Sequence, residues 1–167
     1  MVDVSADHLA GGSAGGGYIP QRANNFSLEI AELEGLRLAL KAASFPTLRV
    51  VKGELAFENE IKYYIQGAEF EPITVSIRDF IDQDIAGKLY DWFKQGYDPE
   101  TGSIGNASDY KKDAVLILHG PDGSNERKWK WQGVFIEEMN MGEGDMEARG
   151  EPVLIELTLS VDKVLRA

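Results

Sequence analysis

The side chains that most often carry out catalysis are scarce in this sequence. It has no cysteine and only two histidines, His8 and His119. His8 lies in a glycine-rich stretch and His119 ends an apolar run, so neither has a sequence neighbour that would complete a catalytic triad or a metal pair. We expect His119 to be a structural histidine. We predict no catalytic residue, no cofactor and no metal site, and we do not expect the chain to be an enzyme.

Carboxylates and glycines are abundant, but their spacing does not indicate a metal or phosphate site. Asp79, Asp82, Asp84 and Asp91 fall where helix caps and solvent-facing helix residues are expected, rather than as a pair that faces a cleft. The segment 98–109 is rich in glycine, aspartate and serine, yet it has neither the register of a calcium loop nor the lysine of a phosphate-binding loop. We interpret this segment as a solvated loop.

The charge of the chain argues against binding to nucleic acid. Seventeen basic and 28 acidic residues give a formal net charge of −11, whereas a surface that neutralises phosphates is basic. The basic and aromatic residues of 127–131 fit a hairpin strand better than a nucleic-acid site. The sequence has neither the layout of a signal peptide nor an apolar run of the roughly 20 residues that span a bilayer, so we expect a soluble protein without membrane contact.

The stretch 73–97 contains two hydrophobic periods and predicts a strand followed by a helix. Ile73, Val75 and Ile77 alternate with polar residues, as in a strand with one buried face. The apolar residues then recur at helical spacing, which predicts a helix over about 82–95 with Asp82 as its N-cap and Gly96 as its stop. The residues of this apolar stripe are Ile85, Leu89, Trp92 and Phe93. We expect this to be the only substantial helix.

The rest of the chain predicts short strands between a flexible arm and the C-terminus. The predicted strands are 26–30, 36–40, 61–65, 73–78, 114–119, 128–136 and 153–161. Residues 1–23 are glycine-rich and predict a flexible arm, and 42–60 predict an extended loop or hairpin excursion. Residues 24–167 are therefore expected to form a single, mainly β (α+β) domain, a small β-sandwich or barrel with one flanking helix.

The order of these segments resembles the tail tube proteins of contractile-tailed bacteriophages. The resemblance covers Asn24 to the C-terminus, and it rests on the order of the motifs rather than on any one of them. The motifs are Asp79–Ile85, the helix at Leu89–Phe93, Ile104–Gly105 before Tyr110–Lys112, the turn Gly120–Gly123 and the strand Lys128–Trp131. The family is similar to the hemolysin-coregulated protein, which forms the tube in type VI secretion. The resemblance implies hexameric rings whose inner strands join into one continuous β-barrel.

The same resemblance implies a function and a set of partners. Stacked rings would form the tail tube of a virion, assembled in the host bacterial cytoplasm, and would conduct the genome into the host cell. Its partners would be further copies, a sheath protein, baseplate and tail terminator proteins. The tape measure protein and double-stranded DNA would pass through the lumen without specific binding. Two alternatives remain: the tube of type VI secretion or of a phage-tail-like bacteriocin, and a monomeric carbohydrate- or peptide-binding module with Trp129 and Trp131 as its platform.

Two groups of residues are candidates for roles in such a tube. The polar faces of the strands 73–78 and 153–161 can line an aqueous channel while the alternate residues fill the core, and acids among them would repel DNA phosphates. The candidate lumen residues are Thr74, Ser76, Arg78, Glu156, Thr158 and Ser160. The candidate inter-subunit residues are Tyr18, Ile19, Phe45, Val50 and Val51.

Overall fold

The computed structural model describes residues 21–33, 36–123, 125–147 and 150–167. Within these ranges the chain is mainly β. The strands are β1 (Phe26–Ile30), β2 (Leu40–Ala43), β3 (Leu48–Phe57), β4 (Glu60–Phe70), β5 (Ile73–Arg78), β6 (Lys112–His119), β7 (Asn125–Asn140), β8 (Leu154–Ser160) and β9 (Lys163–Arg166). The helices are α2 (Leu36–Ala39), α3 (Ile85–Gly96), α4 (Ala107–Tyr110) and the 3₁₀ turn η1 (Ile81–Gln83). No helix among the described residues is long and apolar enough to cross a membrane.

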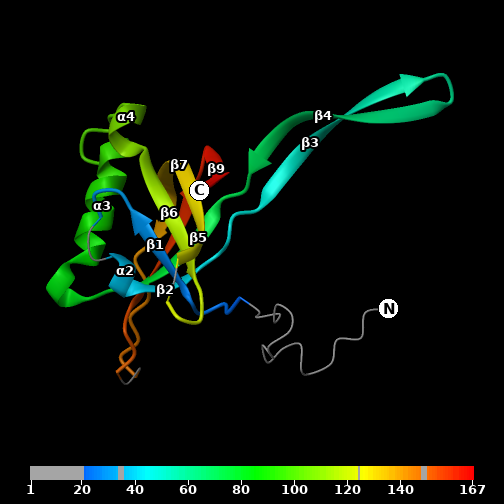
Figure 1. Ribbon diagram of the computed structural model, residues 1–167. Coiled ribbons are helices and arrows are strands. Elements are labelled where there is room, and N and C mark those ends of the chain that lie inside the picture. Colours follow the sequence, from blue (N-terminus) through cyan, green and yellow to red (C-terminus); the bar gives the residue numbers. More distant parts are fainter. Residues whose placement is uncertain (1–20, 34–35, 124, 148–149) are drawn as a thin grey trace, which may run out of the picture.

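Strand β7 joins two halves of one sheet. The strand order is β1-β6-β7-β8-β5-β2, and β9 also pairs with β7. The first part of β7 pairs with β6 and β9, while its last residues pair with β8. We call the half formed by the end of β7 with β8, β5 and β2 the inner half, and the half formed by β1, β6, β9 and the start of β7 the outer half (Figure 1). The predicted mainly β, sandwich-like fold is confirmed.

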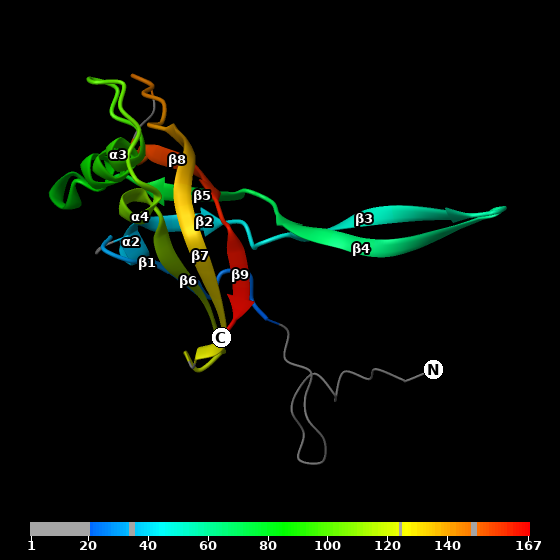
Figure 2. The ribbon, with the colours of Figure 1, turned by 90° about the horizontal axis from the view of Figure 1, so that it is seen from above.

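The core lies between the two halves of this sheet. It combines buried side chains from the inner strands, such as Val75 and Leu157, with others from the outer strands, such as Leu28, Leu116 and Trp131. Along β5 and β8 every second residue is buried. This is the pattern that the alternation of apolar and polar residues predicted, with one face of each strand in water. The helix α3 and the hairpin of β3 and β4 lie on opposite sides of this body (Figures 1 and 2).

Helix α3 has the predicted buried stripe but a different start. Its N-cap is Asp84 rather than Asp82, since residues 81–83 form the 3₁₀ turn and place Asp82 before the helix. Asp84 adopts a left-handed conformation with φ of 45°, and its carboxylate accepts a hydrogen bond from the Gly87 amide at 3.3 Å. A Cβ on Gly87 would collide with this carboxylate. The glycine inside the helix is thus the residue that leaves space for the cap.

Three further segments differ from the prediction. Residues 36–40 were predicted as a strand, but they form the single turn α2 followed by β2. Leu36 and Ala39 are both buried, and burial at i and i+3 favours a helical turn. The prediction was wrong because apolar residues over only five positions fit the strand period of two as well as the helical period of 3.6. Strand β9 and the short helix α4 were not predicted, and β7 extends to Asn140 into a segment predicted as a loop.

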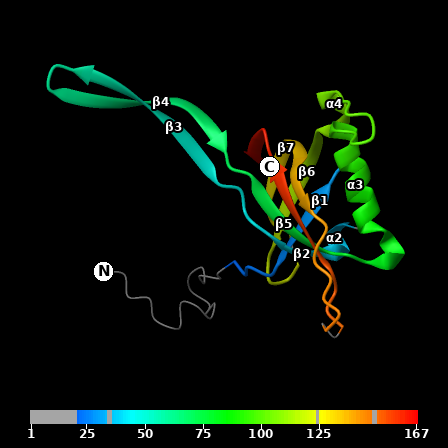
Figure 3. The same ribbon diagram turned by 180° about the vertical axis from the view of Figure 1, so that it is seen from behind.

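Strands β3 and β4 form a separate two-stranded ribbon. They pair from Leu48 opposite Phe70 to Phe57 opposite Glu60, with one irregularity after Val51. The ribbon projects from the body, in a direction different from that of the loop between β7 and β8 (Figure 3). It occupies much of the predicted excursion over 42–60, and the strand predicted at 61–65 lies inside β4.

Candidate assembly surfaces

All six candidate lumen residues lie on one face of the inner half of the sheet. Thr74 is opposite Thr158, and Ser76 is opposite Glu156. The neighbouring residues in the sequence point into the core, so these polar side chains point away from it. Arg78 and Ser160 have the same alternation and share this face, which we call the polar face.

The polar face also receives side chains from β7 that the sequence prediction missed. Glu138 is opposite Thr158, and Asn140 is opposite Glu156. Both are exposed, and together with Glu156 they add two carboxylates and an amide to the hydroxyl groups of the face. Alternation continued from the buried Ile136 would turn Glu138 toward the core, and the irregularity of the β7–β8 register between these two residues places it opposite Thr158 instead.

The inner half of the sheet has an open edge on either side. Among the described residues β2 pairs only with β5, and the end of β7, residues 135–140, pairs only with β8. The Ser44 amide donates to the Thr74 carbonyl at 2.8 Å. In an antiparallel ladder this makes Ala43 and Val75 a non-hydrogen-bonded pair, so the N–H of Ala43 points outward to the open edge. Unpaired edges of this kind are templates for pairing with another chain.

The ribbon of β3 and β4 exposes large apolar side chains along its length. They are Val50, Leu55, Phe57, Ile61, Tyr63, Tyr64 and Ile65, with Ile65 76% exposed. An isolated two-stranded ribbon that leaves such residues in water has the character of an interaction surface. Of the candidate inter-subunit residues, Phe45 and Val50 are exposed and Val51 is half-buried near the root of the ribbon. Tyr18 and Ile19 lie outside the described residues.

A short β-bridge and a group of charged side chains hold the loop after α3 in place. Tyr97 and Ile104 form an isolated antiparallel bridge. The backbone amide of Glu100 donates to the Asp98 carboxylate at 3.0 Å, and this bond, assisted by Lys94, holds the pKa of Asp98 below its usual value. The carboxylates of Asp98 and Glu100 in turn raise the pKa of Lys94. These charges stabilise an exposed turn and do not form a reactive site.

His119 and the tryptophan pair occupy structural positions. The Ser27 hydroxyl and His119 Nε2 are 2.9 Å apart, and no third group that would complete a triad contacts this pair in the described part of the chain. Trp131 is fully buried in the core, and Trp129 is half-buried. The aromatic platform of Trp129 and Trp131, on which the alternative of a carbohydrate- or peptide-binding module depended, is therefore wrong, because Trp131 is fully buried.

Comparisons with known proteins identify the fold. No protein-family model and no curated protein matches the sequence. A chain of the PVC sheath–tube complex of an extracellular contractile injection system superposes with a TM-score of 0.71 at 16% identity, covering 98% of this chain and 97% of that one. The tube-terminating cap of the anti-feeding prophage gives a TM-score of 0.71 at 16% identity, covering 89% and 91%.

A third solved structure shares the fold at lower similarity. Hcp1 from Flavobacterium johnsoniae has a TM-score of 0.52 at 12% identity, covering 86% of this chain and 94% of that one. The fold of this chain is that of a tail tube protein, as the resemblance of the sequence predicted.

Proposed function

We propose that this chain is the structural subunit of a hollow tube in a contractile tail. Copies would form hexameric rings that stack into a tube inside a contractile sheath, with residues 24–167 as the tube domain. The observation that carries the proposal is the polar face bounded by two open edges on the same half of the sheet. If β2 of one copy pairs with the end of β7 of the next, the sheet continues around a ring, and a closed barrel has no remaining edge.

Stacking of rings requires surfaces other than the strand edges that would join neighbouring copies within one ring. The exposed ribbon of β3 and β4 and the glycine-rich arm, residues 1–23, are the segments that we assign to these contacts. The similar solved structures come from a sheath–tube complex and a tube-terminating cap. This supports a sheath protein and a terminator as further partners of the present chain, and we assign a baseplate protein as another.

The cargo of the tube follows from the chemistry of its inner surface. The polar face has hydroxyl groups and the carboxylates of Glu138 and Glu156. A lumen lined by it would repel the phosphates of DNA and would bind a passing protein only weakly. This suits the passage of a tape measure protein and double-stranded DNA in a phage virion, our first assignment. A second candidate is the tube of an extracellular contractile injection system, favoured by the solved structure with that description.

Electron microscopy of the purified protein tests the proposal. We expect negatively stained rings or tubes, and a large species in size-exclusion chromatography. The matched variant is Ala43→Pro, which removes an outward N–H at the edge of β2 while leaving the bonds to β5 in place. Proline is tolerated on edge strands of this kind, so the variant should fold as a monomer and form no rings. A wild-type protein that stays monomeric at every concentration would refute the proposal.

Nuclease treatment of native particles separates the two machines. Protected DNA in particles that contain this chain would identify a phage tail. Particles without DNA would identify an injection system.

A further inference from the structure

An apolar pocket opens at the root of the ribbon, between it and the outer half of the sheet. Its volume is about 400 Å³, and its lining is mainly apolar. Its lining includes Phe45, Leu48, Leu118, Arg127, Trp129 and Val164. We call it the root pocket.

At the root pocket, the apolar face of the outer strands extends beyond the part that the inner half of the sheet covers. Leu116 is opposite Trp129 and Leu118 is opposite Arg127, on the same face of the outer strands as the buried Trp131. Further along the strands this face meets the inner half of the sheet, but here it meets the root of the ribbon. Apolar surface is thus left open at this end of the body.

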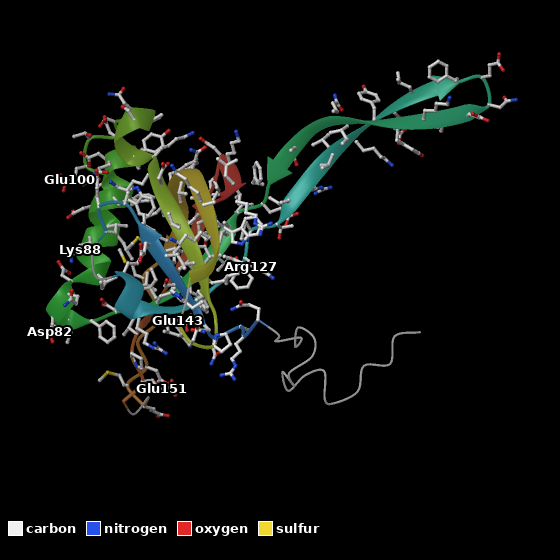
Figure 4. All side chains as sticks on the ribbon, in the orientation of Figure 1. Asp82, Lys88, Glu100, Arg127, Glu143 and Glu151 are labelled. Atoms are coloured by element: carbon white, nitrogen blue, oxygen red, sulfur yellow. The ribbon has the colours of Figure 1, made fainter. Side chains whose placement is uncertain are left out.

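The rim of the root pocket is basic although the chain is acidic. Arg127 lines the pocket, and Arg166 is opposite Trp129 on β9, on the same side of the sheet. Neither arginine has an ion-pair partner in the described part of the chain. Figure 4 shows Arg127 on the side of the body where the ribbon leaves it. An apolar segment that carries carboxylates is the complementary occupant.

The tip of the ribbon has this chemistry. Phe57 and Ile61 are 56% and 57% exposed, and two carboxylates lie between them, Glu58 in the turn and Glu60 at the start of β4. The tip cannot reach the root pocket of its own chain, because Leu48 already lines that pocket and Phe57 is nine residues further along an extended strand. At about 3.3 Å per residue, this separation is roughly 30 Å.

We propose that the ribbon tip of one copy inserts into the root pocket of a neighbouring copy. Phe57 and Ile61 would cover the open apolar surface, and Glu58 and Glu60 would face the arginines of the rim. The contact joins different surfaces of identical subunits, so it can propagate along an assembly. This inference rests on the proposed function and names the receptor of the ribbon.

Cysteine cross-linking tests the contact on a chain that has no cysteine of its own. Asn59→Cys at the tip is combined with Val164→Cys in the root pocket, and assembled protein is treated with a short bismaleimide. We expect a ladder of covalent multimers. The matched control combines Asn59→Cys with Ile104→Cys, and should give no ladder, because Ile104 lines a different apolar pocket, beside α3.

Other outcomes overturn the contact. Tubes without a Val164 ladder, or a ladder through Ile104, would refute the inference and leave the proposed function standing. A ladder between Ile19→Cys and Val164→Cys would show that the arm occupies the pocket. Protein that forms neither rings nor tubes would refute both the contact and the function.

Charge reversal provides an independent measurement. Arg127→Glu should raise the protein concentration needed for tube formation by roughly tenfold or more, and adding Glu58→Arg and Glu60→Arg should restore assembly. Lys128→Glu is the matched control, because this exposed neighbour points to the opposite face of β7. Equal effects of the two single reversals, or no rescue, would contradict the contact.

Discussion

The two buried tryptophans allow the energetics of the core to be tested with matched substitutions. Trp92 of α3 is 2% exposed, and its Nε1 donates to the carbonyl of Tyr110 at 2.7 Å. Trp131 of β7 is fully buried, and its Nε1 has no hydrogen-bond partner among the described residues. Phenylalanine at either position removes the same ring atoms and the same N–H, so the difference between the two variants reports mainly on hydrogen bonding.

The expected difference follows from the two environments. Trp92→Phe removes a hydrogen bond and leaves the Tyr110 carbonyl without this donor, at a cost of about 1–3 kcal/mol beyond the lost packing. Trp131→Phe removes a buried donor that is already unsatisfied, which offsets part of its packing loss. We expect Trp92→Phe to lower the free energy of unfolding by about 2 kcal/mol more than Trp131→Phe.

Urea denaturation followed by far-ultraviolet circular dichroism measures this difference. Both variants are compared with the wild type at protein concentrations below those at which rings form, because assembly adds its own stabilisation. Equal m-values are required for the comparison. A loss for Trp131→Phe that equals or exceeds the loss for Trp92→Phe would refute the reasoning.

Three further predictions concern a turn, a charge and the ribbon. Gly133→Ala should lower the melting temperature more than Gly123→Ala, since both glycines have positive φ but only at Gly133 would a Cβ collide with Asp162. The pKa of Asp98 is lowered in the folded chain, so the stability that its carboxylate contributes is fully present above the ordinary pKa of 3.8 and is lost as the pH falls through the folded-state pKa. The difference in melting temperature between the wild type and Asp98→Asn should therefore become smaller in acid. Phe57→Ser should reduce tube formation in electron micrographs without changing the melting temperature of the monomer, since this side chain is exposed on the ribbon.

Local sequence patterns correctly predicted β5, β8 and α3, because the spacing of apolar residues within each of these elements shows which side is buried. The alternation in β5 and β8 and the stripe of α3 each contain enough residues to distinguish a period of two from one of 3.6. The N-cap was misplaced by two residues because Asp82 and Asp84 both precede the stripe, and only the 3₁₀ turn decides between them. The segment at α2 was too short for its period to be read.

The polar face was predictable residue by residue, whereas its extent and its edges were not. Alternation assigns Thr74 and Thr158 to the wet side of their strands without knowledge of any partner. It does not tell which strands are neighbours, so the contribution of Glu138 and the open edges at β2 and β7 appear only in the structure.

The sequence by itself determined which side of β5, β8 and α3 is buried, because one-sided burial imposes a period on neighbouring residues. Tertiary structure alone decided that β7 serves both halves of the sheet and that the ribbon stands apart from the body. It also decided that Arg127 and Trp129 border an open pocket. These features depend on pairing between residues far apart in the chain, and a local period carries no information about such pairing.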